Sequence, residues 1–232
     1  MNPLLLSHLN EARRQRRAVI AVTDTATGAG RLVDEVLRDE QDPLAGELAE
    51  RFRSGVSGMA RTAGEEASLL TVHLPAPRLV IIGAVHVSQA LAPMATLAGF
   101  DVTIVDPRTA FATAARFPRA TLRAAWPQDA FADEPLEPYT ALAAMTHDPK
   151  IDDGALMAAL AAGCFYIGAL GSRKTHAKRR ERLGAAGIED KALNLIHAPI
   201  GVDIYARSPA EIAVSVLAEI IGTLRSRDLG SG

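Results

Sequence analysis

The sequence predicts an α/β protein with a doubly wound parallel sheet, preceded by a small α+β domain. After residue 77, uninterrupted apolar runs alternate with segments of helical periodicity, which is typical of parallel strands joined by helices. Pro75-Ala76-Pro77 interrupts the chain, and two prolines so close favour an extended linker. We therefore expect a small amino-terminal α+β domain over residues 1–76 and a Rossmann-like carboxyl-terminal domain over residues 77–232.

The amino-terminal segment contains two short strand-like runs, at residues 18–22 and 69–72. Three apolar residues between them repeat at helical spacing and predict a helix: Leu44, Leu48 and Phe52. Glycine and serine are frequent over residues 54–64, where we expect a loop.

The carboxyl-terminal segment supplies the parallel strands. We expect them at residues 78–83, 102–105, 122–125, 140–145, 165–168 and 193–196. Helical periodicity predicts helices over residues 87–97 and 153–162, each followed by a glycine suited to end it.

The last predicted helix begins at Ser208-Pro209-Ala210-Glu211, which has the pattern of a capping box with proline at the first helical position. Its apolar residues form one wide stripe down to Leu224. We expect this stripe to cover the sheet or to take part in a contact between protomers, and a homodimer is one consequence.

Composition excludes several classes of protein. The formal charge is −2, from 25 basic and 27 acidic residues, which argues against a protein that coats nucleic acid. The single cysteine, Cys164, cannot form an intramolecular disulfide, and beside an apolar strand we expect it in the core. The apolar run near the start precedes its arginines, which is the wrong order for a signal peptide. No segment is long and apolar enough to span a membrane, so we expect a cytoplasmic protein.

The first candidate site is the turn after the first parallel strand, which reads Gly83-Ala84-Val85-His86-Val87-Ser88. A dinucleotide fingerprint belongs at this position, and Asp106 follows the next strand, where an acidic residue accepts hydrogen bonds from a ribose. Val85 and Ser88 occupy the second and third glycine positions, so we expect poor NAD binding. The helix that begins here still offers free N–H groups to an anion.

The second candidate site is the segment Gly168-Ala169-Leu170-Gly171-Ser172-Arg173-Lys174. Ser172 is suited to cap a helix, and Gly171 permits a loop close to a ligand. Cations in a first helical turn oppose the helix dipole, so Arg173 and Lys174 predict an oxyanion nearby. The further basic residues from Lys178 to Arg182 we interpret as a solvated face.

The third candidate site is Thr146-His147-Asp148, directly after a predicted strand. His197, Gly201 and Asp203 follow the last predicted strand and would reach the same crevice. Histidine and aspartate side chains can bind divalent metals, and these segments together with the first contain five of them: His86, His147, His197, Asp148 and Asp203. Their spacing, however, matches no known metal-binding motif. We expect Asp148 to orient His147 or to cap a turn, and the histidines to bind a polar ligand.

These motifs together resemble a known family. Gly83-Ala84-Val85-His86-Val87, Asp106-Pro107-Arg108, Arg116-Phe117-Pro118, Thr146-His147-Asp148, Gly168-Ala169-Leu170-Gly171-Ser172-Arg173 and His197-Ala198-Pro199-Ile200-Gly201-Val202-Asp203-Ile204 are similar, in this order, to the carboxyl-terminal domain of xanthine dehydrogenase accessory (XdhC/CoxI) proteins. The resemblance implies a maturation factor for a molybdenum hydroxylase such as xanthine or carbon monoxide dehydrogenase. Such a factor binds the molybdenum cofactor, protects it while its sulfido ligand is installed, and delivers it.

The resemblance also implies partners. They are an apo molybdenum hydroxylase as client and a cysteine desulfurase as sulfur donor. The sequence departs from the family at Val85 and Tyr205, where glycine is usual, and residues 1–74 contain no cysteine.

Three functions remain open from the sequence. The first is a chaperone that carries molybdopterin, as the mononucleotide or the dinucleotide form, without turnover of its own. The second is an NAD(P)-dependent oxidoreductase, which Val85 disfavours. The third is an interaction protein with an empty crevice. We name no catalytic residue and no metal ligand, and the candidate cofactor-binding residues are Gly83, Ala84, His86, Val87, Asp106, Arg108, Thr146, His147, Asp148, Gly171, Ser172, Arg173, Lys174, His197, Gly201 and Asp203.

Overall fold

A computed structural model describes residues 3–62 and 66–226 of the chain. The chain divides at the proline linker into two compact units. The first comprises the residues up to Pro75 together with those from Arg225 onward, and the second spans Ala76–Leu224. Residues 227–232 of the predicted carboxyl-terminal domain lie outside the described residues.

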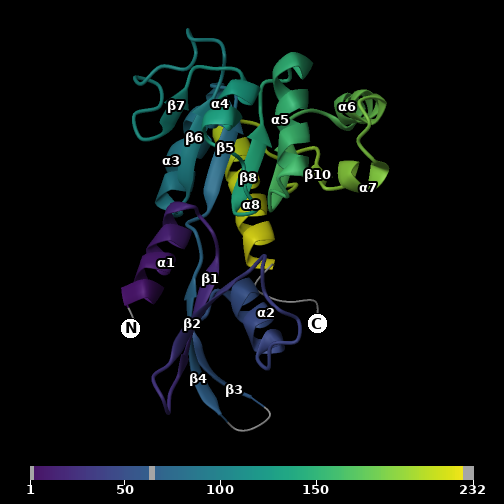
Figure 1. Cartoon of the computed structure of the whole chain (residues 1–232). Coiled ribbons are helices and arrows are strands. Elements are labelled where there is room, and N and C mark those ends of the chain that lie inside the picture. The colour runs from purple at the N-terminus through teal and green to yellow at the C-terminus, as the bar shows by residue number, and fades with distance from the viewer. Residues whose placement is uncertain (1–2, 63–65, 227–232) are drawn as a thin grey trace. The chain divides into compact units, whose positions relative to one another are not determined.

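The first unit is an antiparallel sheet with helices, coloured purple to blue in Figure 1. Its elements are α1 (Pro3–Arg14), β1 (Val19–Asp24), β2 (Gly30–Asp34), α2 (Ala45–Ser54), β3 (Gly58–Arg61) and β4 (Ala67–His73), with strand order β2-β1-β4-β3. The predicted helix is confirmed as α2, which buries Leu48 and Phe52. Helix α1 and strand β2 were not predicted.

The loop expected over residues 54–64 is wrong in part. β3 lies within it, because β4 offers a free edge on which Gly58 to Arg61 pair in antiparallel register. Ala60 is buried in this strand, whereas its neighbours Met59 and Arg61 are exposed. Residues 63–64 of the expected loop lie outside the described residues.

The second unit is the predicted α/β domain. It contains β5 (Arg78–Ile82), α3 (His86–Leu97), β6 (Asp101–Val105), β7 (Thr121–Arg123), α4 (Pro127–Asp133), β8 (Thr140–Ala144), α5 (Pro149–Ala161), β9 (Tyr166–Ala169), α6 (Arg173–Ala185), α7 (Asp190–Leu193), β10 (Ile196–His197) and α8 (Pro209–Ser226). All its strand pairs are parallel, in the order β10-β9-β8-β5-β6-β7. Counted from β5, this is the order of a dinucleotide-binding Rossmann domain, so the predicted fold is confirmed.

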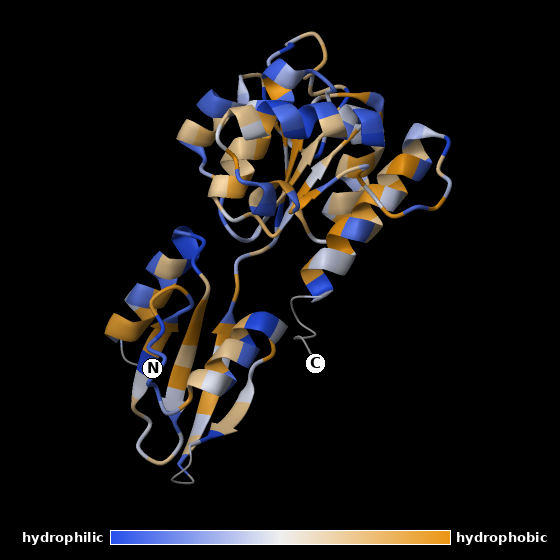
Figure 2. Cartoon of the chain, turned by 90° about the vertical axis from the view of Figure 1, so that its right-hand side faces the viewer, coloured by the Kyte–Doolittle hydropathy of each residue, from blue (hydrophilic) through white to orange (hydrophobic). Residues whose placement is uncertain are grey.

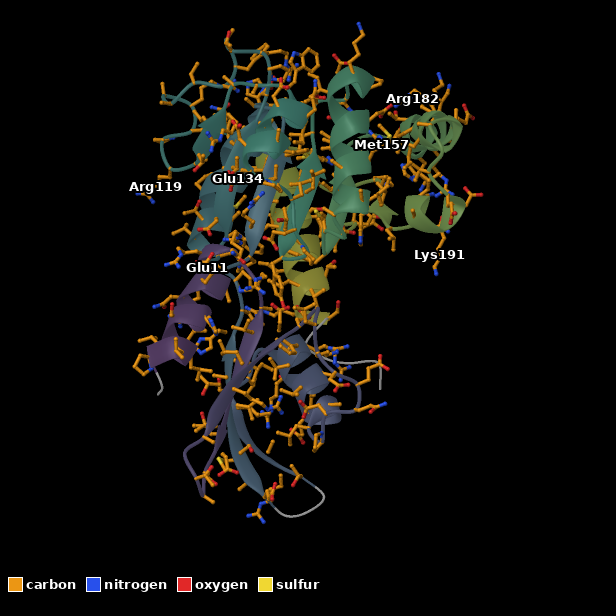
Figure 3. All side chains as sticks on the ribbon, in the orientation of Figure 1. Glu11, Arg119, Glu134, Met157, Arg182 and Lys191 are labelled. Atoms are coloured by element: carbon orange, nitrogen blue, oxygen red, sulfur yellow. The ribbon has the colours of Figure 1, made fainter. Side chains whose placement is uncertain are left out.

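Two hydrophobic cores cover the two faces of this sheet. On one face α3 and α8 pack through residues such as Leu91 and Val216. On the other face α5 and α6 pack through residues such as Leu156 and Leu183. Figure 2 shows the central strands as hydrophobic and the outer helical turns as more hydrophilic. Met157 of α5 and Arg182 of α6 are labelled in Figure 3.

Several predicted boundaries move. The strand expected at residues 193–196 is reduced to β10, because Leu193 ends helix α7 and is buried there. The helix expected from residue 153 begins at Pro149, because Asp148 caps it by accepting a hydrogen bond from the Lys150 amide at 3.0 Å. The strand expected at 122–125 covers Thr121–Arg123, and the one expected at 165–168 covers Tyr166–Ala169.

The terminal helix confirms its predicted cap. The Ser208 amide donates to the Glu211 carboxylate at 2.9 Å, and the Glu211 amide donates to the Ser208 hydroxyl at 3.2 Å. Ala213, Val216 and Ile220 are buried against the sheet. The stripe therefore serves as core within this unit.

Candidate functional site

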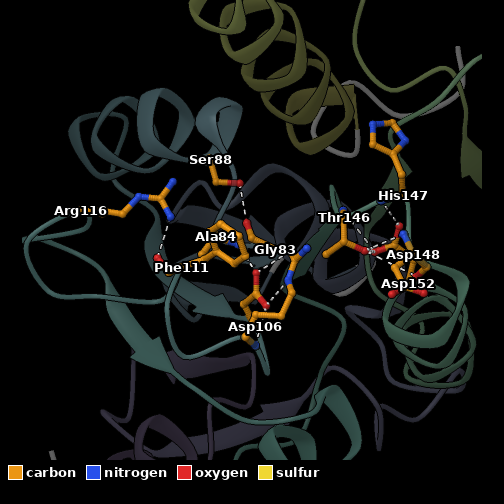
Figure 4. Close-up of polar contacts among 11 residues, drawn as sticks. Gly83, Ala84, Ser88, Asp106, Phe111, Arg116, Thr146, His147, Asp148 and Asp152 are labelled. Atoms are coloured by element: carbon orange, nitrogen blue, oxygen red, sulfur yellow. Dashed lines mark hydrogen bonds and ion pairs between the residues drawn. The ribbon is translucent and has the colours of Figure 1, made fainter.

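The direction of winding reverses between β5 and β8, and a doubly wound sheet has its ligand crevice at the carboxyl ends of the strands at such a point. Gly83 follows β5 with φ of +110°, and a Cβ atom there would lie 2.7 Å from Cγ2 of Thr146, which follows β8. Only glycine fits at this contact, because a side chain would meet both strain and collision. The two strand ends thus bring the first and third candidate segments together (Figure 4).

The turn after β5 is tightly bonded to its own surroundings. The Ala84 amide donates to Asp106 at 2.8 Å, and the Ser88 hydroxyl donates to the Gly83 carbonyl at 2.6 Å. Val87 is buried in the core, whereas His86 is exposed at the start of α3. Of the two, only His86 is available to a ligand.

Asp106 is fully buried, and Arg108 binds it from three donors. Oδ1 accepts the Arg108 amide and Nε, both at 2.9 Å, and Oδ2 accepts Arg108 Nη2 and the Ala84 amide, both at 2.8 Å. Burial raises the pKa of this carboxyl, but the Arg108 and Ala84 hydrogen bonds outweigh it and hold the pKa below its ordinary value. A carboxylate has about four acceptor positions, and all are filled, so a ribose could bind only by displacing Arg108.

Asp152 organises the turn after β8, and no pattern in the sequence singled it out. Its carboxylate accepts the Thr146 hydroxyl at 2.7 Å and the His147 amide at 3.0 Å. This contact holds His147 in a left-handed conformation, with φ of +64°. Burial raises the pKa of Asp152 above its ordinary value, against the lowering effect of these hydrogen bonds. The ring of His147 points away from this carboxylate (Figure 4).

The segment after β9 approaches the same turn. Gly171 has φ of +135°, and Nδ1 of His147 lies 3.7 Å from where a Cβ of Gly171 would stand. Ser172 caps α6 as predicted, because its hydroxyl accepts the Thr175 amide at 3.2 Å. Arg173 and Lys174 in the first turn are exposed. The second and third candidate segments therefore meet at His147.

The solvated face expected from Lys178 to Arg182 is wrong at Arg179, which is 2% exposed. Arg182 binds Asp153 through two hydrogen bonds, of 2.6 and 3.0 Å. Arg180 donates to Asn194 at 2.8 Å. A run of basic residues in the sequence does not show which of their side chains faces the neighbouring helix. In α6 it is Arg179 that is buried.

The residues after β10 belong to a different cluster, centred on Glu219 of α8. Glu219 accepts the Tyr166 hydroxyl at 2.6 Å and the Gly201 amide at 2.8 Å, and it pairs with His197 Nδ1 at 3.1 Å. Burial raises the pKa of Tyr166, whereas the His197 and Tyr166 hydrogen bonds lower that of Glu219 against the effect of burial. His197 and Gly201 are therefore bonded to the protein itself. Asp203 is exposed and accepts the Tyr205 amide at 3.3 Å.

Metal binding and thiol chemistry have little support among the described residues. No group of three or more His, Cys, Asp or Glu side chains there is placed to hold a metal ion, so the histidine and aspartate set does not assemble. Cys164 is buried as expected, and burial raises its pKa to about 12. No helix within residues 3–62 and 66–226 has both the length and the hydrophobicity to cross a bilayer.

The fold and this site define a Rossmann-type domain. Asp106, at the position where such domains bind a ribose, is instead hydrogen-bonded to Arg108 and Ala84. Residues 79–220 match the family described as the XdhC Rossmann domain. The chain belongs to the XdhC family.

Three relatives support the assignment. The chain is 35% identical over 150 residues to a Bacillus subtilis protein named as a probable xanthine dehydrogenase subunit, covering 64% of this chain and 43% of that protein. It is 34% identical over 146 residues to "Molybdenum cofactor insertion chaperone PaoD" of Escherichia coli, covering 63% and 40%. It is 32% identical over 174 residues to "Uncharacterized protein YqeB" of Escherichia coli, covering 73% and 31%. The chain thus spans less than half the length of these relatives.

A solved structure shares the fold. The crystal structure of a xanthine dehydrogenase from Bacillus halodurans superposes with a TM-score of 0.69, at 22% sequence identity, covering 98% of this chain and 68% of that one.

Proposed function

We propose that this chain is an accessory protein that binds the molybdenum cofactor, protects it in sulfurated form, and delivers it to a hydroxylase of the xanthine or carbon monoxide dehydrogenase type. Membership of the XdhC family supports this proposal, together with the relative named as a molybdenum cofactor insertion chaperone. The proposed partners are the apo hydroxylase and a cysteine desulfurase. The proposed setting is the cytoplasm, with the chain as a homodimer.

One geometric observation favours this function over hydride transfer. Asp106, which would hold the ribose of a nicotinamide dinucleotide, has its acceptor positions filled by Arg108 and Ala84. Val85 also stands at the position where close approach of a pyrophosphate requires glycine. A domain that carries the mononucleotide form of molybdopterin needs neither contact, because that form has no ribose and no pyrophosphate.

The remaining polar groups of the crevice are compatible with a phosphorylated pterin. The ring of His147 beside Gly171 can bond a polar ligand. Arg173 and Lys174, in the capped first turn of α6, can attract a phosphate. When bound, the cofactor supplies the metal centre that the client enzyme uses. This chain would hold the cofactor and shield it from water.

Mass spectrometry tests the proposal. The chain is produced in a host that makes molybdopterin, and the small molecules released on denaturation are identified. Purified protein is then titrated with NADH by fluorescence. We expect recovery of molybdopterin and no NADH binding at micromolar concentration. Nanomolar NADH binding without a pterin would overturn this proposal in favour of the NAD(P)-dependent oxidoreductase, with which the Rossmann strand order is also compatible.

Two variants locate the phosphate contact. Arg173→Ala should reduce molybdopterin recovery about tenfold, since one charge-assisted contact contributes on the order of 1.5–3 kcal/mol, and should leave thermal stability unchanged because the side chain is exposed. Lys191→Ala, an exposed residue of α7, is the matched control. Equal losses of stability and recovery for Arg173→Ala would assign Arg173 a structural role.

A further inference from the structure

Arg179 of α6 is a buried cation with unused hydrogen-bond donors. The side chain is 2% exposed. Its Nη2 donates to the Leu170 carbonyl at 3.1 Å, whereas Nε and Nη1 are buried without a partner. Buried donors are nearly always bonded, and an arginine offers five of them in a planar fork. Two nitrogens with three unpaired N–H donors on one buried guanidinium therefore point to a ligand.

The nearby carboxylates do not occupy these donors. Asp152 uses its oxygens for Thr146 and His147, and Asp153 binds Arg182. Within residues 3–62 and 66–226 no ion pair of 4.0 Å or less joins Arg179 to a carboxylate. Burial lowers the pKa of Arg179, against the attraction of Asp152 and Asp153. A bound anion would supply the missing partner.

Arg179 lines a cavity between α5 and α6. The cavity measures about 160 Å³, whereas a water needs about 10–15 Å³ by the same measure. Lys174, Thr175 and Lys178 also line it. Both lysines are exposed, and neither forms an ion pair with another residue in the described part of the chain. His147, Asp152, Asp153 and Arg182 line the cavity as well. The two carboxylates are already bonded, Asp152 to Thr146 and His147 and Asp153 to Arg182. The cavity thus adds one buried guanidinium with unpaired donors and two exposed ammonium groups to these bonded residues.

We propose that this cavity between α5 and α6 is a binding site for a phosphoryl group, held by Arg179 with Lys174 and Lys178. A guanidinium binds two oxygens of a phosphate through parallel N–H groups. Lysines act as point charges on the remaining oxygens. The ligand class is a phosphate monoester or a pyrophosphate. The cavity shares His147 and Lys174 with the proposed cofactor site, but the inference rests on the unpaired donors of Arg179 and does not require the proposed function.

Isothermal titration of the purified, cofactor-free chain with inorganic pyrophosphate tests the site. We expect saturable binding, with Lys174→Ala/Lys178→Ala weakening it at least tenfold. Because both lysines are exposed, that variant keeps the fold. Arg179→Gln should abolish binding, and circular dichroism shows whether the variant is folded. Lys191→Ala, exposed and away from the cavity, is the control.

Three results would overturn this inference. They are no binding of pyrophosphate at millimolar concentration, the same affinity in the double lysine variant, or an equal loss in Lys191→Ala, which would indicate nonspecific attraction. Lys174 belongs to both proposals, so two single variants separate them. Lys178→Ala should weaken pyrophosphate binding, whereas Arg173→Ala, outside the cavity lining, should leave it unchanged and lower only molybdopterin recovery. Recovery of molybdopterin without pyrophosphate binding rejects only this site, and pyrophosphate binding without molybdopterin rejects only the proposed function.

Discussion

The carboxylate of Asp152 binds the hydroxyl of Thr146 at 2.7 Å and thereby fixes the end of β8 to the first turn of α5. The same carboxylate accepts the His147 amide. One buried side chain thus sets the conformation of the turn that faces the crevice, and its loss should loosen that turn.

Asp152→Asn should lower the free energy of unfolding by about 1–3 kcal/mol, because an amide group supplies one acceptor oxygen where two are used and leaves a buried N–H unpaired. Asp153→Asn is the matched control on the same helix. Its ion pair with Arg182 is partly exposed, so the loss should stay below about 1 kcal/mol. Urea unfolding followed by circular dichroism compares the two, and equal losses would contradict the role given to Asp152.

Arg108→Leu should destabilise the chain by about 1–3 kcal/mol at neutral pH, because the buried Asp106 loses two side-chain donors. The pKa of Asp106 lies below its ordinary 3.8 in the folded chain. Its stabilising contribution is therefore complete above pH 3.8 and is lost as the pH falls through the folded pKa. In the Arg108→Leu variant, the Arg108 hydrogen bonds no longer offset the effect of burial, so the pKa of Asp106 should rise. The stability difference should consequently shrink toward pH 3.

Urea unfolding at several pH values between 3 and 7 measures this difference. Arg119→Leu, at an exposed arginine outside the pair, serves as the control and should show no such trend. A difference between Arg108→Leu and the parent chain that stays constant with pH would show that Asp106 is not the group responsible.

Gly201→Ala should cost at least about 2 kcal/mol. The residue has φ of +93°, and a Cβ atom would lie 2.2 Å from the Ser215 hydroxyl, so strain and overpacking add. Gly222→Ala, within α8 and with nothing inside 4 Å, should instead stabilise by about 0.5–1 kcal/mol. Thermal unfolding of both variants tests the contrast, and similar midpoints would refute it.

Glu219→Ala should cost about 2–3 kcal/mol, since it removes the acceptor of the Tyr166 hydroxyl and the Gly201 amide. Glu219→Gln keeps an acceptor oxygen and should cost less than half as much. Chemical unfolding of the two variants gives the comparison. If Gln were as damaging as Ala, the negative charge beside His197 would be the important property.

Local signals in the sequence located the four longer helices of the second unit, α3, α5, α6 and α8, and most of its strands, but not the short helices α4 and α7. The Ser208 and Ser172 caps form as their patterns indicate, because a cap depends on residues within one turn. Strand β3 was missed because it forms only on the edge that β4 provides. Sequence patterns do not contain that partner.

The polar centres were harder to predict for the same reason. Asp152 and Glu219 lie within helices, where a carboxylate is ordinary, and only folding brings their partners to them. Arg179 belonged to a basic run that suggested solvent exposure, yet the packing of α5 against α6 buries it. The candidate residues His197 and Gly201 were found from motifs, but their bonding to Glu219 was not.

Cys164 limits how sulfur can reach any cofactor carried here. Burial raises the pKa of this thiol to about 12, which strongly disfavours the thiolate at pH 7, and the thiolate is the form that attacks sulfur. Burial also keeps a persulfide donor from reaching it. Within these 232 residues, no accessible thiol is therefore available to pass sulfur to a cofactor.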